Sequence, residues 1–434
     1  MTAPSHAAPR GPENGAPGEP GRSAVSLALA LAPGTLLAGI AGGIAFPILP
    51  IAGLRLGLSL PFIGAILAAN RAVRVVSGPF VGVLADRLGG RRTLLFGLVV
   101  QVVVLGLYAL GVVSHRVGPF FLGGRLLHGV GSACVFISAQ ALALHAGGAS
   151  HSGRSAGTVR AAMVLGIPIG LAAGGLLSDA VGDAATFGIA AAAVVLALIA
   201  AHFTVPDLRA PLGRRPPLLD TLRGMRDRRL LALGALNLVL NFGVGGMILT
   251  TLALLVHGRH VSVLSRNEQG TSGLLMAWMI VIDAALTPLA GRIGDRWRAH
   301  ARVAAAAMAF LAAGLAVVGL SGRVTGLAVG LTLVGIGGAG LGPSLLVLMG
   351  GIVPREQRGT GVGLLQLCGD VGGVLGPLVG TVLLAGNAAA PYLGTSALVA
   401  CFMPLALWLA STERSRHESA AARTGGLDGR RGST

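Results

Sequence analysis

Long apolar stretches recur along the whole chain, and they constrain its fold more than any other feature. Each is about 18 to 26 residues long, the length that an α-helix needs to cross a hydrocarbon core about 30 Å thick. The stretches are continuously apolar and lack a two-residue alternation, which favours helices over a β-barrel. We therefore predict an all-α membrane protein with twelve spanning helices, at residues 24–49, 61–83, 94–114, 120–145, 158–179, 185–204, 230–256, 271–291, 303–320, 326–350, 359–384 and 392–411.

The composition agrees with this prediction. Hydrophobic residues make up 53% of the chain and charged residues only 11%, whereas a soluble domain carries about a quarter charged residues. The 70 Gly residues also fit a bundle of membrane helices, because small residues let helix backbones approach closely.

The predicted helices divide into two sets of six. The longest internal polar stretch, residues 206–229, contains seven Arg and separates the sixth helix from the seventh. We predict two six-helix bundles, at residues 23–205 and 230–411, joined by this basic cytoplasmic linker. Residues 1–22 and 412–434 lack a periodic apolar pattern, and we expect them to form disordered tails.

The basic residues, all of them Arg, indicate the orientation of the chain. The net charge is +17, and far more Arg lie in loops on the side of the two termini than in the opposite loops. By the positive-inside rule, both termini are expected to face the cytoplasm, with the protein in the plasma membrane. These Arg are scattered through short loops with few aromatic neighbours, so nucleic acid is not an expected partner.

Several kinds of chemistry find no support in the sequence. The three Cys lie inside apolar runs without metal or disulfide spacing. Because the chain has no Lys, it has no phosphate-binding loop of the G-x-x-x-x-G-K-[ST] type. Neither a catalytic triad nor a metal-ligand cluster is present. We expect no enzyme activity, no cofactor and no metal, and nothing demands more than a monomer.

An internal repeat relates the two halves. Residues 79–87 follow the second helix and residues 288–296 follow the eighth, and their Pro, Gly, Asp and Arg match at one constant offset. Repeated halves are typical of secondary transporters.

The first copy of the repeat carries a family motif. It continues as Gly82-Val-Leu-Ala-Asp86-Arg87-Leu-Gly89-Gly-Arg91-Arg92, which resembles the loop motif G-x-L-A-D-R-x-G-R-K/R-x of the major facilitator superfamily. The resemblance implies a conformational latch between the halves, with a second copy at Gly291, Asp295 and Arg296. The alternative is an ordinary basic cytoplasmic loop.

Two further segments resemble motifs of the same superfamily. The fourth helix contains Arg125-Leu-Leu-His128-Gly-Val-Gly, with His128 where the family usually has Gln. The resemblance implies that Arg125 assists proton coupling, although an Arg that pairs structurally is the alternative. The fifth helix resembles the antiporter motif of drug:proton exporters, except that Leu171 replaces the usual Pro. Its glycines, three of them spaced four residues apart, favour close helix packing over a chemical role: Gly166, Gly170, Gly174 and Gly175.

Five ionisable residues fall well inside predicted helices, where an unpaired charge is costly. The first half contributes Arg71, Arg74 and Arg125, and the second half contributes Asp283 and Asp370. Our hypothesis is that Asp283 or Asp370 carries a coupling proton while an Arg tunes it. A static ion pair that holds the halves together is the alternative.

Uncharged polar residues in the same helices are candidates for the substrate site. We name Asn70, Gln140, Asn237, Asn241 and Gln366, each of which is also consistent with an interhelical hydrogen bond.

The sequence thus predicts a transporter that exports drugs or metabolites by proton antiport and alternating access. Its expected partners are a small-molecule substrate, protons and the lipid bilayer. Import by proton symport and export of organic anions remain alternatives within the same fold, and a non-transporting membrane sensor or lipid-handling protein is an alternative from another class.

Overall fold

The protein is described from a computed structural model that places residues 20–146, 148–206, 227–264, 266–353 and 358–428. These residues are helical apart from short connections, which confirms the all-α prediction. The helices of the first half are α1 (Pro20–Arg55), α2 (Leu60–Leu88), α3 (Gly90–Val113), α4 (Val117–Ala146), α5 (Gly148–Val181) and α6 (Asp183–Thr204). Those of the second half are α8 (Arg228–Leu240), η2 (Asn241–Ile248), α9 (Leu249–Gly258), α10 (Glu268–Trp297), α11 (His300–Leu320), α12 (Val324–Ile352), α13 (Arg358–Gly386) and α14 (Ala390–Asp428).

Within this described part, 12 segments are long and apolar enough to cross a membrane, as predicted. The seventh of them, Arg228–Gly258, consists of α8, η2 and α9 in succession. Several helices are longer than the apolar runs because polar residues at the membrane edge can continue a helix into water. Thus α2 ends at Leu88 rather than at residue 83, and α5 begins at Gly148 rather than at residue 158.

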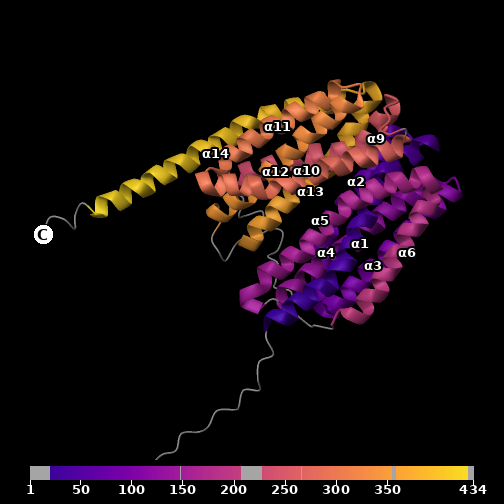
Figure 1. The fold of residues 1–434 in the computed structure, drawn as a ribbon, viewed down its shortest axis with the longest axis horizontal. Helices are drawn as coiled ribbons and strands as arrows, with labels where there is room; N and C mark the ends of the chain where they lie inside the picture. Colours follow the sequence, from indigo (N-terminus) through magenta and orange to yellow (C-terminus); the bar gives the residue numbers. More distant parts are fainter. Residues whose placement is uncertain (1–19, 147, 207–226, 265, 354–357, 429–434) are drawn as a thin grey trace, which may run out of the picture.

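The helices of each half gather into a bundle of their own (Figure 1). In the first bundle α1 packs most extensively on α5, and α3 on α4; in the second, α11 packs on α12 and α14. Each bundle buries an apolar cluster, which includes Leu98 and Phe187 in the first and Leu311 and Leu331 in the second. Each half therefore has its own core.

The two bundles meet where α2 packs on α13, α5 packs on α10, and α1 contacts both α9 and α10. Gly64 of α2 lies against Thr381 of α13, and Gly175 of α5 lies against the main chain of Gln269 in α10. We call this region, where α1 ends and α10 begins, the closed end. Towards the side where α1 begins and α14 ends, the bundles diverge (Figure 1), and Phe80 of α2 is 71% exposed. We call that side the open end.

The structure describes much of the expected C-terminal tail but little of the expected N-terminal tail. The tail expected from residue 412 is wrong, because α14 continues as a helix to Asp428. This segment is rich in Ala, Arg and Glu, which favour helix over coil. Residues 1–19 and most of the expected linker, 207–226, lie outside the described residues, and α1 begins at Pro20.

Candidate transport site

An ion cluster joins the two bundles near the middle of their shared face. Arg74 of α2 forms an ion pair with Oδ1 of Asp370 on α13. Arg71, one turn earlier on α2, places its Nη1 4.0 Å from the same oxygen. The Asp370 side chain is 7% exposed, whereas those of Arg71 and Arg74 are 18% and 33% exposed. Two guanidinium groups therefore share one carboxylate, which leaves the cluster with an excess positive charge.

Arg71 also reaches a π-helical segment that the sequence analysis did not anticipate. Nη2 of Arg71 donates a hydrogen bond of 3.1 Å to the main-chain oxygen of Gly245 in η2. π-Helical turns are rare and occur often at functional sites. A Cβ on Gly376 of α13 would lie 2.5 Å from the main-chain oxygen of Phe242, so only Gly lets α13 approach η2 this closely. Arg71 thus connects α2 to both α13 and the seventh span.

Asp283, the second carboxylate predicted inside a span, has a different environment. It lies on α10 and is not part of the Arg cluster; no cation pairs with it among the described residues. Its carboxyl group faces Gly338 of α12, where a Cβ would lie 3.2 Å from Cγ of Asp283. The neighbouring hydroxyl of Thr287 donates to the main-chain oxygen of Asp283 at 2.8 Å. The two Asp residues inside spans of the second half are therefore not equivalent, since only Asp370 is paired with Arg among the described residues.

Arg125 lies inside the first bundle rather than at the interface between bundles. It is 0% exposed, and its Nε, Nη1 and Nη2 atoms have no hydrogen-bond partner. Its guanidinium carbon stands 5.0 Å from the ring centre of Phe46 on α1, an arrangement that gives cation–π attraction. The hydroxyl of Tyr108 lies beside it and interacts with it, although the two groups do not meet the geometry of a hydrogen bond. A buried cation without an anionic partner is costly inside a membrane-spanning helix.

His128 is an ionisable residue that our count of five omitted. It lies one turn after Arg125 on α4 and is 6% exposed. Its ring faces Gly42 of α1, where a Cβ would lie 3.8 Å from Nε2 of His128. The sequence signal was present, because the motif comparison had already marked His128 as a departure from Gln. The first bundle thus buries an imidazole between α4 and α1.

The closed end is held by a polar network that sequence reasoning missed. Oδ2 of Asp179, near the end of α5, accepts from the main-chain N–H of Asn267 at 3.1 Å, and its Oδ1 accepts from that of Gly270 at 3.3 Å. The carboxylate therefore caps the N-terminus of α10, where the helix dipole favours negative charge. Arg55 adds an ion pair of 2.9 Å with Glu268. Because α5 and α1 belong to one bundle and α10 to the other, these contacts connect the halves.

Comparison with known proteins identifies the family. The model of the Major Facilitator Superfamily matches residues 31–267 and 235–431. The chain belongs to the major facilitator superfamily. It is accordingly an integral membrane transporter and not an enzyme.

Three bacterial proteins illustrate the similarity. A multidrug efflux protein of Bacillus subtilis is 27% identical over 242 residues, which cover 55% of this chain and 57% of that protein. A multi-drug resistance efflux pump homolog of Lactococcus lactis is 25% identical, over 70% of this chain and 74% of its own length. A multidrug resistance protein of Escherichia coli is 26% identical, over 61% and 64%. The chain thus spans little more than half of the Bacillus protein.

Two solved structures share the fold. The nucleoside transporter NupG superposes with a TM-score of 0.71 at 13% identity, over 90% of this chain and 99% of that one. The human organic anion transporter MFSD10 superposes with a TM-score of 0.65 at 20% identity, over 88% and 99%. At these identities the likeness concerns the architecture alone.

The superfamily loop motif makes no hydrogen bond or ion pair between the bundles in its described residues, which exclude the side chain of Asp86. A Cβ on Gly82 or Gly291 would have no atom within 4 Å. Asp295 contacts His300 of its own bundle at 3.0 Å, and Arg91 donates to the main-chain oxygen of His202 in the first bundle. The side chain of Asp86 lies outside the described residues, and Gly89 separates α2 from α3 with a φ of 89°. Three further motif residues are exposed: Arg87, Arg92 and Arg296.

The glycines of the antiporter-like motif sit at close helix contacts. A Cβ on Gly166 or Gly170 would lie 2.2 Å from a main-chain oxygen of α1, and one on Gly174 would meet Ile44 at 2.8 Å. The fourth, Gly175, faces α10 instead, where a Cβ would lie 2.2 Å from the main-chain oxygen of Gln269. In this conformation all four make room for a neighbouring backbone.

The uncharged polar candidates fall into two groups. Asn237 donates to the main-chain oxygen of Leu365 at 2.6 Å, and Asn241 donates to that of Asn237 at 3.0 Å, so both are engaged in helix contacts. The remaining three are not paired in this way: Asn70 is half-buried beside Arg71, Gln366 is exposed, and Nε2 of Gln140 is buried without a partner.

Proposed function

We propose that this transporter exports small molecules in exchange for protons, by alternating access to a site between its two bundles. The efflux names of its relatives support this direction of transport. The Arg-rich loops lie on the side of the open end, so we place that end in the cytoplasm. In this orientation the described conformation receives substrate from the cell interior.

The environment of Asp283 is the observation that carries the proposal. A carboxylate inside a span is costly when ionised, unless a counter-charge or a proton neutralises it. Asp283 has no cation partner among the described residues, so it requires a proton or a cationic substrate. The proton and the cationic substrate would compete for the Asp283 carboxylate. Such competition exchanges one for the other. We assign Asp283 as the proton carrier.

Asp370 has a different proposed role. Arg74 and Arg71 already neutralise it across the interface, so it gains less from a proton. We assign the cluster of Arg71, Arg74 and Asp370 to coupling between the bundles, with Asn70 and Gln366 beside it as substrate-lining groups. A proton bound at Asp283 and a contact broken at Asp370 would then be separate steps of one cycle.

Inside-out vesicles energised with an acidic interior test the assignment. Addition of a transported dye or antibiotic should dissipate the pH gradient in the wild type. Asp283→Asn should reduce this response at least tenfold while leaving the amount of folded protein unchanged, because the amide cannot exchange a proton. Asp227→Asn, at the exposed start of α8, is the matched control and should transport normally.

Two results would contradict the proposal. Full retention of gradient-driven transport in Asp283→Asn would remove Asp283 as the carrier. A gradient that drives substrate with the proton rather than against it would identify a symporter, which is the import alternative.

Export of organic anions is a second candidate, favoured by the excess positive charge of the Arg cluster. Two guanidinium groups share Asp370, and the unpaired Arg125 lies deeper in the same bundle. One similar structure is that of an organic anion transporter. A series of dyes of equal size and different charge separates the two candidates. Cations should be exported best if Asp283 binds substrate, and anions if Arg71 and Arg74 do.

A further inference from the structure

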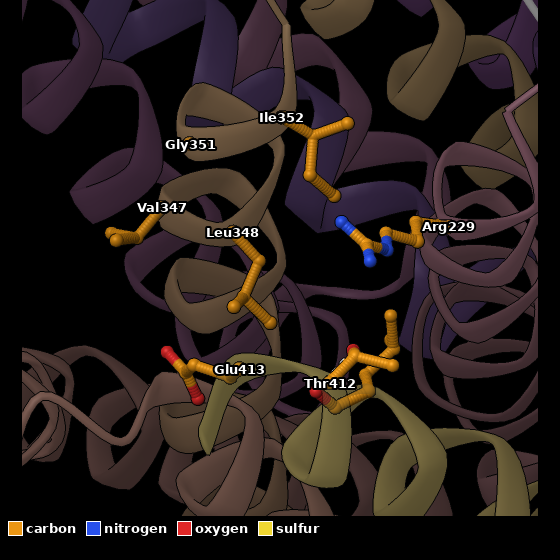
Figure 2. Close-up of a pocket in the computed structure, with 8 residues that line it drawn as sticks. Arg229, Val347, Leu348, Gly351, Ile352, Thr412 and Glu413 are labelled. Carbon is orange, nitrogen blue, oxygen red and sulfur yellow. Dashed lines mark hydrogen bonds between the residues drawn. The ribbon is translucent and has the colours of Figure 1, made fainter. Parts of the chain in front are cut away.

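A cavity of about 280 Å³ lies within the second bundle, away from the interface between bundles. It is lined by the start of α8, the end of α12 and α14, and it is open on one side (Figure 2). Its lining includes Arg229, Val347, Leu348, Ile352 and Glu413. Small-molecule sites commonly measure roughly 300–1,000 Å³, so this cavity suits a headgroup-sized ligand rather than a large drug.

The cavity contains one positive and one negative side chain that do not neutralise each other. Arg229 and Glu413 lie on different sides of it (Figure 2). Oε2 of Glu413 accepts from the main-chain N–H of Ala301 at 3.0 Å, which fixes this carboxylate at the N-terminus of α11. In the described part of the chain, the Arg229 guanidinium has no hydrogen bond or ion pair, and it forms none with Glu413. The site thus offers two separated, opposite charges.

The remaining walls are apolar and lie at the membrane edge. Val347, Leu348 and Ile352 belong to the last turns of α12, whose span ends at Ile352. The span of α8 begins at Arg228 and that of α14 ends at Glu413, so the cavity is lined by residues at the limits of all three spans. A cavity at the ends of three spans lies where lipid headgroups meet acyl chains, and basic pockets between helices at this depth bind headgroups.

We propose that this cavity binds the headgroup of a zwitterionic phospholipid that carries a primary amine, of the phosphatidylethanolamine class. Arg229 binds the phosphate, and Glu413 accepts a hydrogen bond from the ammonium group. The acyl chains follow the apolar wall formed by Val347 and Leu348. A purely anionic headgroup is disfavoured because Glu413 repels it, and a trimethylated amine is disfavoured because it has no N–H to donate.

Native mass spectrometry of the purified full-length protein with added lipid tests this site. The probes are phosphatidylethanolamine, phosphatidylcholine and phosphatidylglycerol with identical acyl chains. The wild type should retain phosphatidylethanolamine at about tenfold lower concentration than the other two, the factor expected for one charge-assisted hydrogen bond.

Two variants and a matched control locate the binding. Arg229→Ala should remove the preference for phosphatidylethanolamine over phosphatidylglycerol. Glu413→Gln should remove the preference over phosphatidylcholine while an amide oxygen still caps α11. Arg228→Ala is the control, because Arg228 is adjacent in sequence, exposed and absent from the cavity lining.

Each contrary outcome overturns the proposal. A phosphatidylethanolamine preference that survives in Arg229→Ala and Glu413→Gln places the lipid elsewhere. Tighter binding of phosphatidylglycerol, strengthened by Glu413→Gln, identifies a site for anionic lipid. Equal retention of all three lipids by the wild type shows that the cavity does not select a headgroup.

Discussion

Single buried charges distinguish this transporter at the residue scale. The sequence placed Arg125 inside a span, and a family motif gave it a role, but neither could reveal that its five N–H donors lack partners. Arg259 offers a natural comparison, because it donates to the main-chain oxygens of Val318, Gly319 and Ser321. The guanidinium of Arg259 is therefore hydrogen-bonded, whereas that of Arg125 is not.

We expect Arg125→Met to preserve or raise stability while it abolishes transport. Replacing a buried charge with an apolar side chain of similar length is often neutral or stabilising by about 1–4 kcal/mol. Arg259→Met should instead lower the thermal unfolding midpoint, since it leaves three carbonyl groups unpaired. Thermal unfolding in detergent and vesicle transport measure both effects. An equal loss of stability in the two variants would mean that Arg125 has a structural partner.

At the scale of elements, the packing of α5 on α1 depends on glycines spaced four apart. The sequence indicated close packing at this motif, and the structure supplies the partner helix. The π-helical segment η2 was not predictable in the same way. Its residues are apolar and Gly-rich like those of an ordinary membrane helix. Its π-helical hydrogen bonding occurs where the segment contacts α13 and Arg71, which lie far away in the sequence.

Gly170→Val should destabilise the first bundle. The new side chain would start 2.2 Å from the main-chain oxygen of Ile40, which forces α1 and α5 apart. Overpacking of this kind costs about 1–3 kcal/mol. Gly188→Val on α6 is the control, because Gly188 is exposed and has no atom near its Cβ position. Size-exclusion profiles after graded heating should show earlier loss of Gly170→Val, and identical profiles would refute the packing role.

At the scale of the whole molecule, the contacts of the closed end stabilise the described conformation. Asp179 caps α10 across the interface, and Arg55 pairs with Glu268 beside it. These contacts exist only while the closed end is shut. Weakening them should favour the opposite conformation without disturbing either core.

Asp179→Ala should therefore shift the conformational equilibrium. Loss of hydrogen bonds to a charged group is worth about 1.5–3 kcal/mol, which corresponds to a roughly 10- to 100-fold change in population. Spin labels at Val181 and Leu264, both exposed at the closed end on different bundles, should report a larger share of long distances. The labelling background replaces Cys368 and Cys401. Asp227→Ala, at the opposite end, should leave the distribution unchanged, and an unchanged distribution in Asp179→Ala would contradict the role.

The sequence by itself determined the spans, the division into halves and the superfamily. These properties depend on hydropathy and on short motifs, which are local and can be read residue by residue. It also supplied the Arg and Asp residues inside the spans, because a charge within an apolar run is conspicuous, although our count omitted His128.

Only the tertiary structure decided which of these groups meet. Arg74 and Asp370 are paired, Asp283 is left without a cation, and Asp179 caps a helix of the other bundle. Glu413, assigned by sequence to the edge of a disordered tail, instead caps α11 beside a cavity. Such contacts join residues far apart in the chain. They arise from how the helices pack, and packing depends on the shapes of all the helices together rather than on any one segment.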